Sequence, residues 1–138
     1  MGLYFVIISV TDISYTDIKM TEKPYVPLTQ AVFHILLALA EGDQHGYRIM
    51  RLIDEHTNGR FRMGPGTLYG SIKRMLEDGL IIEVVNTETK PETDQRRRYY
   101  RLTGKGRQAL QDEAERINLL AEQLRAKRLV QKPDGSVP

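Results

Sequence analysis

Residues 64–80 constrain the fold of this chain most, because they combine a helix start, an apolar stripe and a helix stop. Pro65 suits the first position of a helix, where its missing N–H would have no partner in any case. Leu68, Ile72 and Met75 recur at helical spacing, so they form a stripe that faces a core. The residues off this stripe are polar or basic and are expected on an exposed face: Thr67, Tyr69, Ser71, Lys73 and Arg74.

A β-hairpin is expected directly after this helix. Residues 81–85 are rich in β-branched side chains, which favours a strand. Residues 86–95 are polar and contain a proline, which is typical of a loop, and residues 97–102 form the return strand. Because side chains alternate along a strand, one of Tyr99 and Tyr100 is expected in the core and the other at the surface.

Two helices precede this unit. Residues 31–40 are apolar on more than one face and therefore need burial on more than one side. The tripeptide at 45–47 begins a second helix that runs to about His56. Its inner face is expected to hold Tyr47, Met50 and Ile53, with Leu52 as a further candidate. The order helix, helix, helix, strand, loop, strand predicts a mainly α fold with a small antiparallel β-hairpin, a winged helix-turn-helix over residues 28–103.

A long C-terminal helix is predicted over residues 104–128. Thr103 is expected to cap it, whereas Gly104 and Gly106 weaken its first turn. Apolar residues follow one another at alternating spacings of four and three, as in a heptad seam: Leu110, Ala114, Ile117, Ala121 and Leu124. This seam predicts a dimer interface, the alternative being a helix that packs only on its own chain. Residues 129–138 are expected to be a flexible tail.

Positive charge is concentrated in two acid-free stretches, although the net charge is only +2. The charged residues between positions 59 and 76 are Arg60, Arg62, Lys73 and Arg74, and those between 95 and 109 are Arg96, Arg97, Arg98, Arg101, Lys105 and Arg107. Such clustering on a weakly basic domain is typical of a protein that contacts a phosphate backbone. The alternative is a solvated face that is merely basic. The consecutive arginines at 96–98 cannot all face one side of a strand.

Residues 1–27 form an N-terminal extension with an apolar run at 3–10. This run is much shorter than the ~20 residues of a membrane span, and it lacks the features of a signal peptide. Two alternatives are open: an extra strand on the domain or its dimer partner, or a start codon upstream of the true one. The second is favoured, with Met20 as the first residue, because an ordinary polar start follows it.

Other function classes find little support in the sequence. The chain has no cysteine, which excludes disulfides and cysteine-ligated zinc and fits a reducing cytoplasm. His34, His45 and His56 lack metal-ligand spacing and are expected to be structural. Neither a nucleophile–base pair nor a phosphate-cradling loop is recognisable. We therefore expect a protein that is not an enzyme, with no cofactor, no metal and no membrane partner.

Short motifs in the same order resemble the PadR family of transcriptional regulators. They read His-Gly-Tyr at 45–47, Pro-Gly-Thr-Leu-Tyr at 65–69, Glu-Asp-Gly-Leu-Ile at 77–81 and Arg-Tyr-Tyr-Arg-Leu-Thr at 98–103. The resemblance covers residues 28–124, and the single C-terminal helix is similar to the shorter PadR subfamily. Two positions depart from the family pattern, because Gly70 replaces the usual proline and Gly64 replaces a frequent serine.

The resemblance implies a homodimeric transcription factor, usually a repressor, that binds a pseudo-palindromic operator and is released by a signal or a small molecule. The third helix would read the major groove with Thr67, Tyr69 and Ser71, while Lys73 and Arg74 neutralise phosphates. The wing at 96–98 would touch the backbone or the minor groove, and the C-terminal helix would pair with its partner. The alternative is a winged-helix module that binds protein without specific DNA binding.

Overall fold

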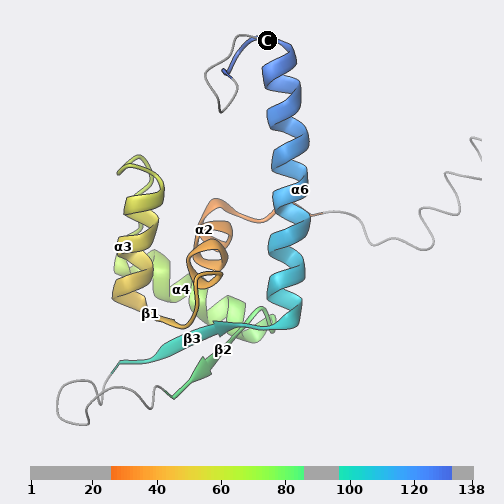
Figure 1. Ribbon diagram of the computed structural model, residues 1–138. Helices are drawn as coiled ribbons and strands as arrows, with labels where there is room; N and C mark the ends of the chain where they lie inside the picture. Colours follow the sequence, from red (N-terminus) through yellow and green to blue (C-terminus); the bar gives the residue numbers. More distant parts are fainter. Residues whose placement is uncertain (1–25, 86–96, 132–138) are drawn as a thin grey trace, which may run out of the picture.

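The computed structural model describes residues 26–85 and 97–131 of the 138-residue chain. In chain order its elements are α2 (Gln30–Leu39), β1 (Gln44–His45), α3 (Gly46–His56), α4 (Pro65–Glu77), β2 (Ile81–Val84), β3 (Tyr99–Leu102) and α6 (Gly104–Ala126) (Figure 1). The fold is mainly helical with a small antiparallel sheet, which confirms the predicted class. The expectations for residues 1–25, for the wing tip with Arg96 and for residues 132–138 of the tail lie outside the described residues.

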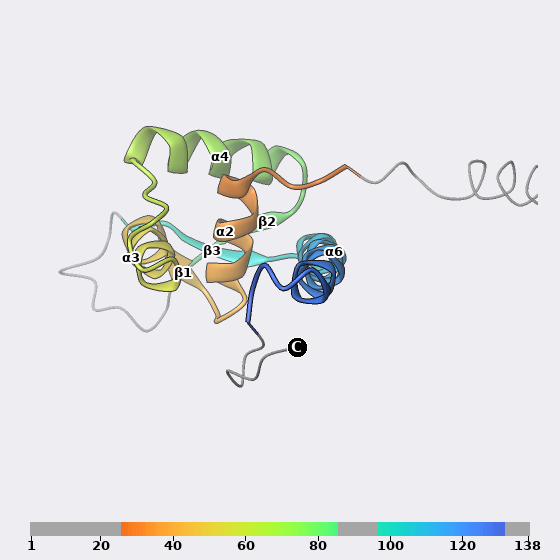
Figure 2. The same ribbon diagram turned by 90° about the horizontal axis from the view of Figure 1, so that it is seen from above.

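Helix α2 is the centre of the fold. Seen from above, it stands between α3 and α6, with α4 along a third side and the sheet beneath (Figure 2). It packs against α3, α4 and α6, as its several apolar faces require. Four of its residues are buried, namely Ile35, Leu36, Ala38 and Leu39. Among the described residues, no helix is both long and apolar enough to cross a bilayer.

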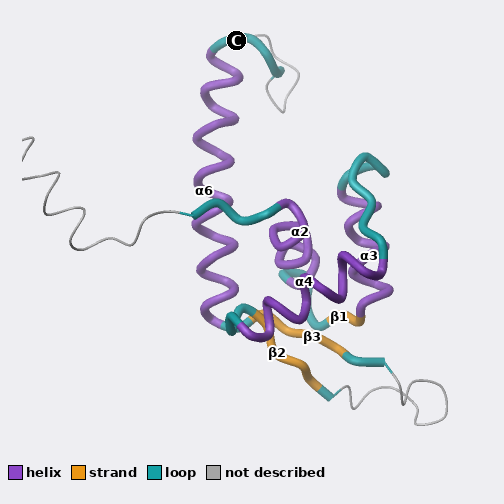
Figure 3. The backbone as a smooth tube through the Cα atoms, turned by 180° about the vertical axis from the view of Figure 1, so that it is seen from behind, coloured by secondary structure: helices purple, strands orange, loops and turns teal. Residues whose placement is uncertain are grey.

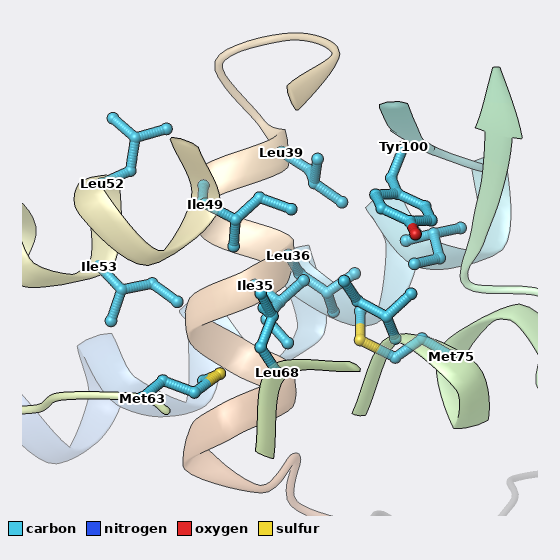
Figure 4. Close-up of a cluster of buried hydrophobic side chains, with 13 residues drawn as sticks. Ile35, Leu36, Leu39, Ile49, Leu52, Ile53, Met63, Leu68, Met75 and Tyr100 are labelled. Carbon is cyan, nitrogen blue, oxygen red and sulfur yellow. The ribbon is translucent and has the colours of Figure 1, made fainter. Parts of the chain in front are cut away.

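The core is filled by one stripe from each neighbouring element (Figure 4). Helix α4 supplies Leu68, Ile72 and Met75, as the sequence predicts. Helix α3 supplies Ile49, Leu52 and Ile53, so the prediction for its inner face is wrong at Tyr47, which is 60% exposed. Tyr47 lies two residues before Ile49, and a separation of two residues places a side chain on the opposite side of a helix. Each fully buried side chain of this size stabilises the fold by about 1.5–3 kcal/mol.

The sheet has three strands in the order β1-β3-β2, all antiparallel. Its register pairs Ile81 with Leu102 and Val84 with Tyr99, while β1 adds Gln44 opposite Tyr100. Strand β1 is not expected from the sequence, because two residues are too few to show a pattern. Its approach to β3 is secured by an ion pair, in which the Arg101 guanidinium donates to both Asp43 carboxylate oxygens at 2.9 and 2.7 Å.

The start of α6 is joined to the end of α4. The Thr103 hydroxyl accepts from the Gly106 N–H at 3.0 Å, which confirms the predicted cap, and donates to the Gly79 carbonyl at 2.6 Å. The Lys105 ammonium donates to the Asp78 carbonyl at 2.7 Å. A Cβ at Gly106 would overlap the Leu80 carbonyl oxygen, so this glycine is required for close packing of α6. Its role is therefore larger than the helix weakening that the sequence predicts.

Candidate nucleic-acid interface

The exposed face of α4 holds most of the predicted contact residues. Its N-cap is Gly64 and its first residue is Pro65, and the side chains of Thr67, Tyr69, Lys73 and Arg74 are exposed. No acid in the described part of the chain forms an ion pair with Lys73 or Arg74, so both cations are available to an external anion.

Ser71 does not belong to this face. It is fully buried, and its hydroxyl has no hydrogen-bond partner among the described residues. Ser71 lies three residues after Leu68 and four before Met75, which places it on the core stripe. The prediction that it faces outward is therefore wrong, because position within the helical repeat outweighs the polarity of a small side chain.

Three glycines expose the backbone of the same helix. A Cβ added at Gly64, Gly66 or Gly70 would meet no other atom within 4 Å. Packing within the chain therefore does not require glycine at these positions. What the missing side chains provide is a strip of bare backbone beside Thr67 and Lys73, which a partner can approach closely.

Helices α3 and α4 meet where the His-Gly-Tyr motif at 45–47 contacts the Pro-Gly-Thr-Leu-Tyr motif at 65–69. The Tyr69 hydroxyl lies 2.6 Å from the point that a Cβ on Gly46 would occupy. The Tyr69 side chain thus crosses from α4 to the first turn of α3, although it remains 51% exposed. Only glycine at position 46 leaves room for this contact.

His45 organises the junction of α3 with the sheet. Its Nδ1 accepts from the Arg48 N–H at 3.2 Å and so caps α3. Its ring stands edge-on to Tyr99 and parallel to Tyr47, with ring centroids 5.4 and 6.4 Å apart. The prediction that this histidine is structural is confirmed, since the cap fixes where α3 begins.

The other two histidines lie elsewhere, His34 within α2 and His56 at the end of α3. The His34 ring stacks on Phe61 with centroids 4.8 Å apart, and His56 Nε2 lies 2.7 Å from a carboxylate oxygen of Glu41. Burial, and then the charge of His56, lower the pKa of His34. Residues 26–85 and 97–131 contain no group of histidine, aspartate and glutamate that is arranged to hold a metal ion.

The base of the wing brings more positive charge to this side of the molecule. Arg97 and Arg98 are exposed just before β3, and the Arg98 Nε lies 3.7 Å from a Glu83 carboxylate oxygen. A cavity of about 500 Å³ separates the wing base from the two helices. Its lining comes from α3, α4 and the sheet: His45, Gly46, Tyr47, Tyr69, Arg97, Arg98 and Tyr100. The structure thus brings Tyr69 together with two of the predicted wing arginines.

Several other basic residues are engaged inside the chain. Arg101 binds Asp43, Lys105 binds the end of α4, and Arg62 lies 3.5 Å from Asp54. The two acid-free stretches of sequence therefore contain structural cations as well as available ones. Sequence alone does not single out Arg101 and Lys105, because their partners lie 58 and 27 residues away along the chain.

Helix α6 carries a second exposed surface. Its first half packs against α2 and the sheet, whereas its second half extends beyond the rest of the fold (Figures 1 and 3). Large apolar side chains are exposed along that half: Ile117 (38%), Leu120 (44%) and Leu124 (43%) on or beside the seam, and Leu119 (59%) off it. Of the other seam residues, Leu110 packs against the core, Ala114 is exposed and Ala121 is half-buried.

A basic, exposed α4 beside a three-stranded sheet defines the class of protein: a winged helix-turn-helix protein. Comparison with known families agrees, because residues 35–112 match the model of the family described as "Transcriptional regulator PadR-like family". The chain belongs to this family of transcriptional regulators.

Individual relatives support the same assignment. The chain is 32% identical over 91 residues to the transcriptional regulator Rv3488 of Mycobacterium tuberculosis, spanning 66% of this chain and 78% of that one. A solved transcriptional regulator from Clostridium thermocellum is similar with a TM-score of 0.57 and 29% identity, over 68% of this chain and 85% of the other. Bacillus subtilis PadR in complex with operator DNA shares the fold, with a TM-score of 0.53 and 24% identity over 63% and 46% of the two chains.

Proposed function

We propose that this chain is a sequence-specific DNA-binding regulator that represses transcription as a homodimer, with α4 as its recognition helix. The observation that carries the proposal is the exposed face of α4, where Thr67, Tyr69, Lys73 and Arg74 stand beside bare glycine backbone. An α-helix of this kind fits the major groove of B-DNA, which is about 12 Å wide.

The residues of this face divide into two roles. Lys73 and Arg74 lack intramolecular ion pairs in the described chain, so they neutralise phosphates and add affinity without reading sequence. The hydroxyls of Thr67 and Tyr69 reach base edges or phosphates. The free amides at the start of α4 receive a phosphate oxygen, as helix N-termini do. Arg97 and Arg98 contact the backbone beside the groove.

The dimer forms through the exposed seam of α6. Ile117 and Leu124 expose apolar surface on a helix that extends past its own domain, and this surface is buried when two copies pair. A two-fold axis then places two copies of α4 in successive major grooves, about 34 Å apart, on a pseudo-palindromic operator. A signal or small molecule releases the operator by binding one arrangement of the two halves more tightly than the other.

Fluorescence anisotropy with the DNA upstream of the protein's own coding region tests the proposal. The titration is run at two salt concentrations with random-sequence competitor. We expect competitor-resistant binding of two chains per site that weakens as salt rises. Binding no tighter than to random DNA, by a folded dimer, would favour the protein-interaction alternative.

A pair of double variants locates the interface. Replacing Lys73 and Arg74 by alanine is expected to weaken binding to every sequence and to lower the salt dependence, since two phosphate contacts are lost. The matched control replaces Lys127 and Arg128 by alanine at the end of α6 that lies far from α4 (Figure 1). Equal DNA affinity of the two double variants would contradict α4 as the recognition helix.

A further inference from the structure

His45 stands where strand β1 ends and α3 begins, so it belongs to both elements (Figure 3). Its backbone pairs with Tyr99 in the sheet. Its side chain caps α3, because Nδ1 accepts a hydrogen bond from the Arg48 N–H at 3.2 Å. Since the donor is a backbone amide, Nδ1 must carry a lone pair, and a second proton on the ring would abolish the bond. The cap therefore exists only while the imidazole is neutral.

The turn that this cap holds is the one that the proposed recognition helix touches. Gly46, which directly follows His45, is buried, and the Tyr69 hydroxyl of α4 lies 2.6 Å from the point that a Cβ on Gly46 would occupy. Without the cap, the first amides of α3 lose their side-chain partner and the first turn frays. Fraying at Gly46 removes the surface against which Tyr69 rests.

The charges at this junction disfavour a positive ring on His45. The arginines at 97–98 line the same cavity as His45, and the first turn of α3 adds the positive end of a helix dipole. The acids on the adjoining strands are paired with arginines. Glu83 lies 3.7 Å from one of the two cavity arginines, and Asp43 binds Arg101.

The other titratable groups around His45 stay in one charge state near neutrality. On α3 itself, the Arg48 guanidinium lies 3.4 Å from a Glu55 carboxylate oxygen. The remaining groups are phenols, which are uncharged where histidine titrates: Tyr47, Tyr69, Tyr99 and Tyr100. A proton taken up at this junction between neutral and mildly acidic pH therefore goes to His45, since an ordinary histidine titrates at about pH 6.5.

We propose that His45 is a positioning residue for DNA binding and that it acts only while its ring is neutral. This inference rests on the proposed function, because the affinity that His45 controls is the affinity for DNA. As the pH falls through the histidine range, the α3 cap opens, Tyr69 loses its support and DNA binding weakens. An added cation by itself would have the opposite effect, since it strengthens the attraction to phosphate.

Fluorescence anisotropy of the full chain with the upstream DNA, at about pH 7.5 and about pH 5.5 and constant ionic strength, tests this role. His45→Asn offers Oδ1 in place of Nδ1 as a cap but does not titrate, whereas His45→Ala has no cap at any pH. We expect the unaltered chain to lose about fivefold in affinity at the lower pH, the size of effect of a lost helix cap. His45→Asn should bind tightly at both pH values and His45→Ala weakly at both.

The matched control is His56→Gln, which removes a histidine from the far end of α3 and should keep the loss of affinity in acid. A loss that persists in His45→Asn, or an affinity that rises in acid, would overturn the proposal. Equal affinity of His45→Asn and His45→Ala at about pH 7.5 would overturn it as well. Circular dichroism at both pH values shows that each variant is folded, and global unfolding of the unaltered chain at the lower pH would also overturn it.

The cap is followed separately without DNA, so that the two proposals can fail independently. In proton–nitrogen NMR spectra of the full chain, the Arg48 amide should shift as His45 titrates, and it should stay in place in His45→Asn. An Arg48 amide that does not respond to pH in the unaltered chain would refute the switch whatever the DNA result. Failure to bind any DNA would refute the proposed function, while the Arg48 amide would still show whether protonation of His45 opens the cap.

Discussion

The Tyr69 hydroxyl lies 2.6 Å from the point that a Cβ on Gly46 would occupy, so the two helices of the helix-turn-helix meet at a position that only glycine allows. The atom concerned is the far end of a flexible side chain. A methyl group at position 46 therefore displaces the Tyr69 side chain, while α3 and α4 stay packed against each other.

Gly46→Ala is expected to leave stability nearly unchanged and to weaken DNA binding. Tyr69 rotates away from α3 and leaves the proposed DNA face, while the core beneath it stays in place. Thermal unfolding and anisotropy on the same preparations separate the two effects. A large fall in the melting temperature would show that the contact is part of the core.

Gly106→Ala should destabilise the fold strongly, by about 2–4 kcal/mol. Its Cβ would overlap the Leu80 carbonyl, a backbone atom that cannot rotate aside. The control is Gly104→Ala in the same turn, where a Cβ meets nothing within 4 Å and helix propensity predicts a gain of about 0.5–1 kcal/mol. Urea unfolding measures both, and similar free energies for the two variants would contradict the packing role of Gly106.

Gly70→Ala should stabilise the free protein by about 0.5–1 kcal/mol, because alanine is the better helix former and open space surrounds the position. The same methyl group should weaken DNA binding if the α4 backbone approaches a phosphate closely. Urea unfolding and anisotropy measure the two effects, with Gly104→Ala as the control away from this face. Unchanged DNA affinity would remove Gly70 from the interface.

Ile117→Asp with Leu124→Asp should give a monomer, because burying two carboxylates in an apolar seam is unfavourable. Leu119→Asp with Gln123→Asp is the matched control, since it adds the same charge to exposed positions off the seam. Sedimentation velocity measures the mass of each. A seam variant that remains a dimer would place the interface elsewhere.

Asp43→Asn should lower stability at neutral pH but not in acid. The hydrogen bond from Arg101 lowers the pKa of Asp43, so the carboxylate contributes stability above its usual pKa of 3.8. That contribution is lost as the pH falls below 3.8 toward the lowered value. Unfolding curves of both proteins should therefore converge in acid, and a constant difference across pH would contradict this role of the ion pair.

Periodicity in the sequence predicts the helices well, because α2, α3 and α4 each bury a regular apolar stripe. It fails where burial depends on partners distant along the chain. Ser71 is polar yet lies on the core stripe, and Tyr47 is apolar in character yet lies outside it. Strand β1 forms because Asp43 meets Arg101 across the sheet, a contact that no local pattern records.

The missing side chain at Gly106 has a mechanical consequence. Thr103 and Lys105 are hydrogen-bonded to the end of α4, and Gly106 packs closely against the Leu80 carbonyl. These contacts fix the orientation of α6 relative to α4. The 23 residues of α6 are about 35 Å long, so the helix is a lever with α4 fixed at its base. In a pair of such chains, a tilt of about 10° between the levers changes the separation of the two α4 helices by about 6 Å, half the width of the major groove.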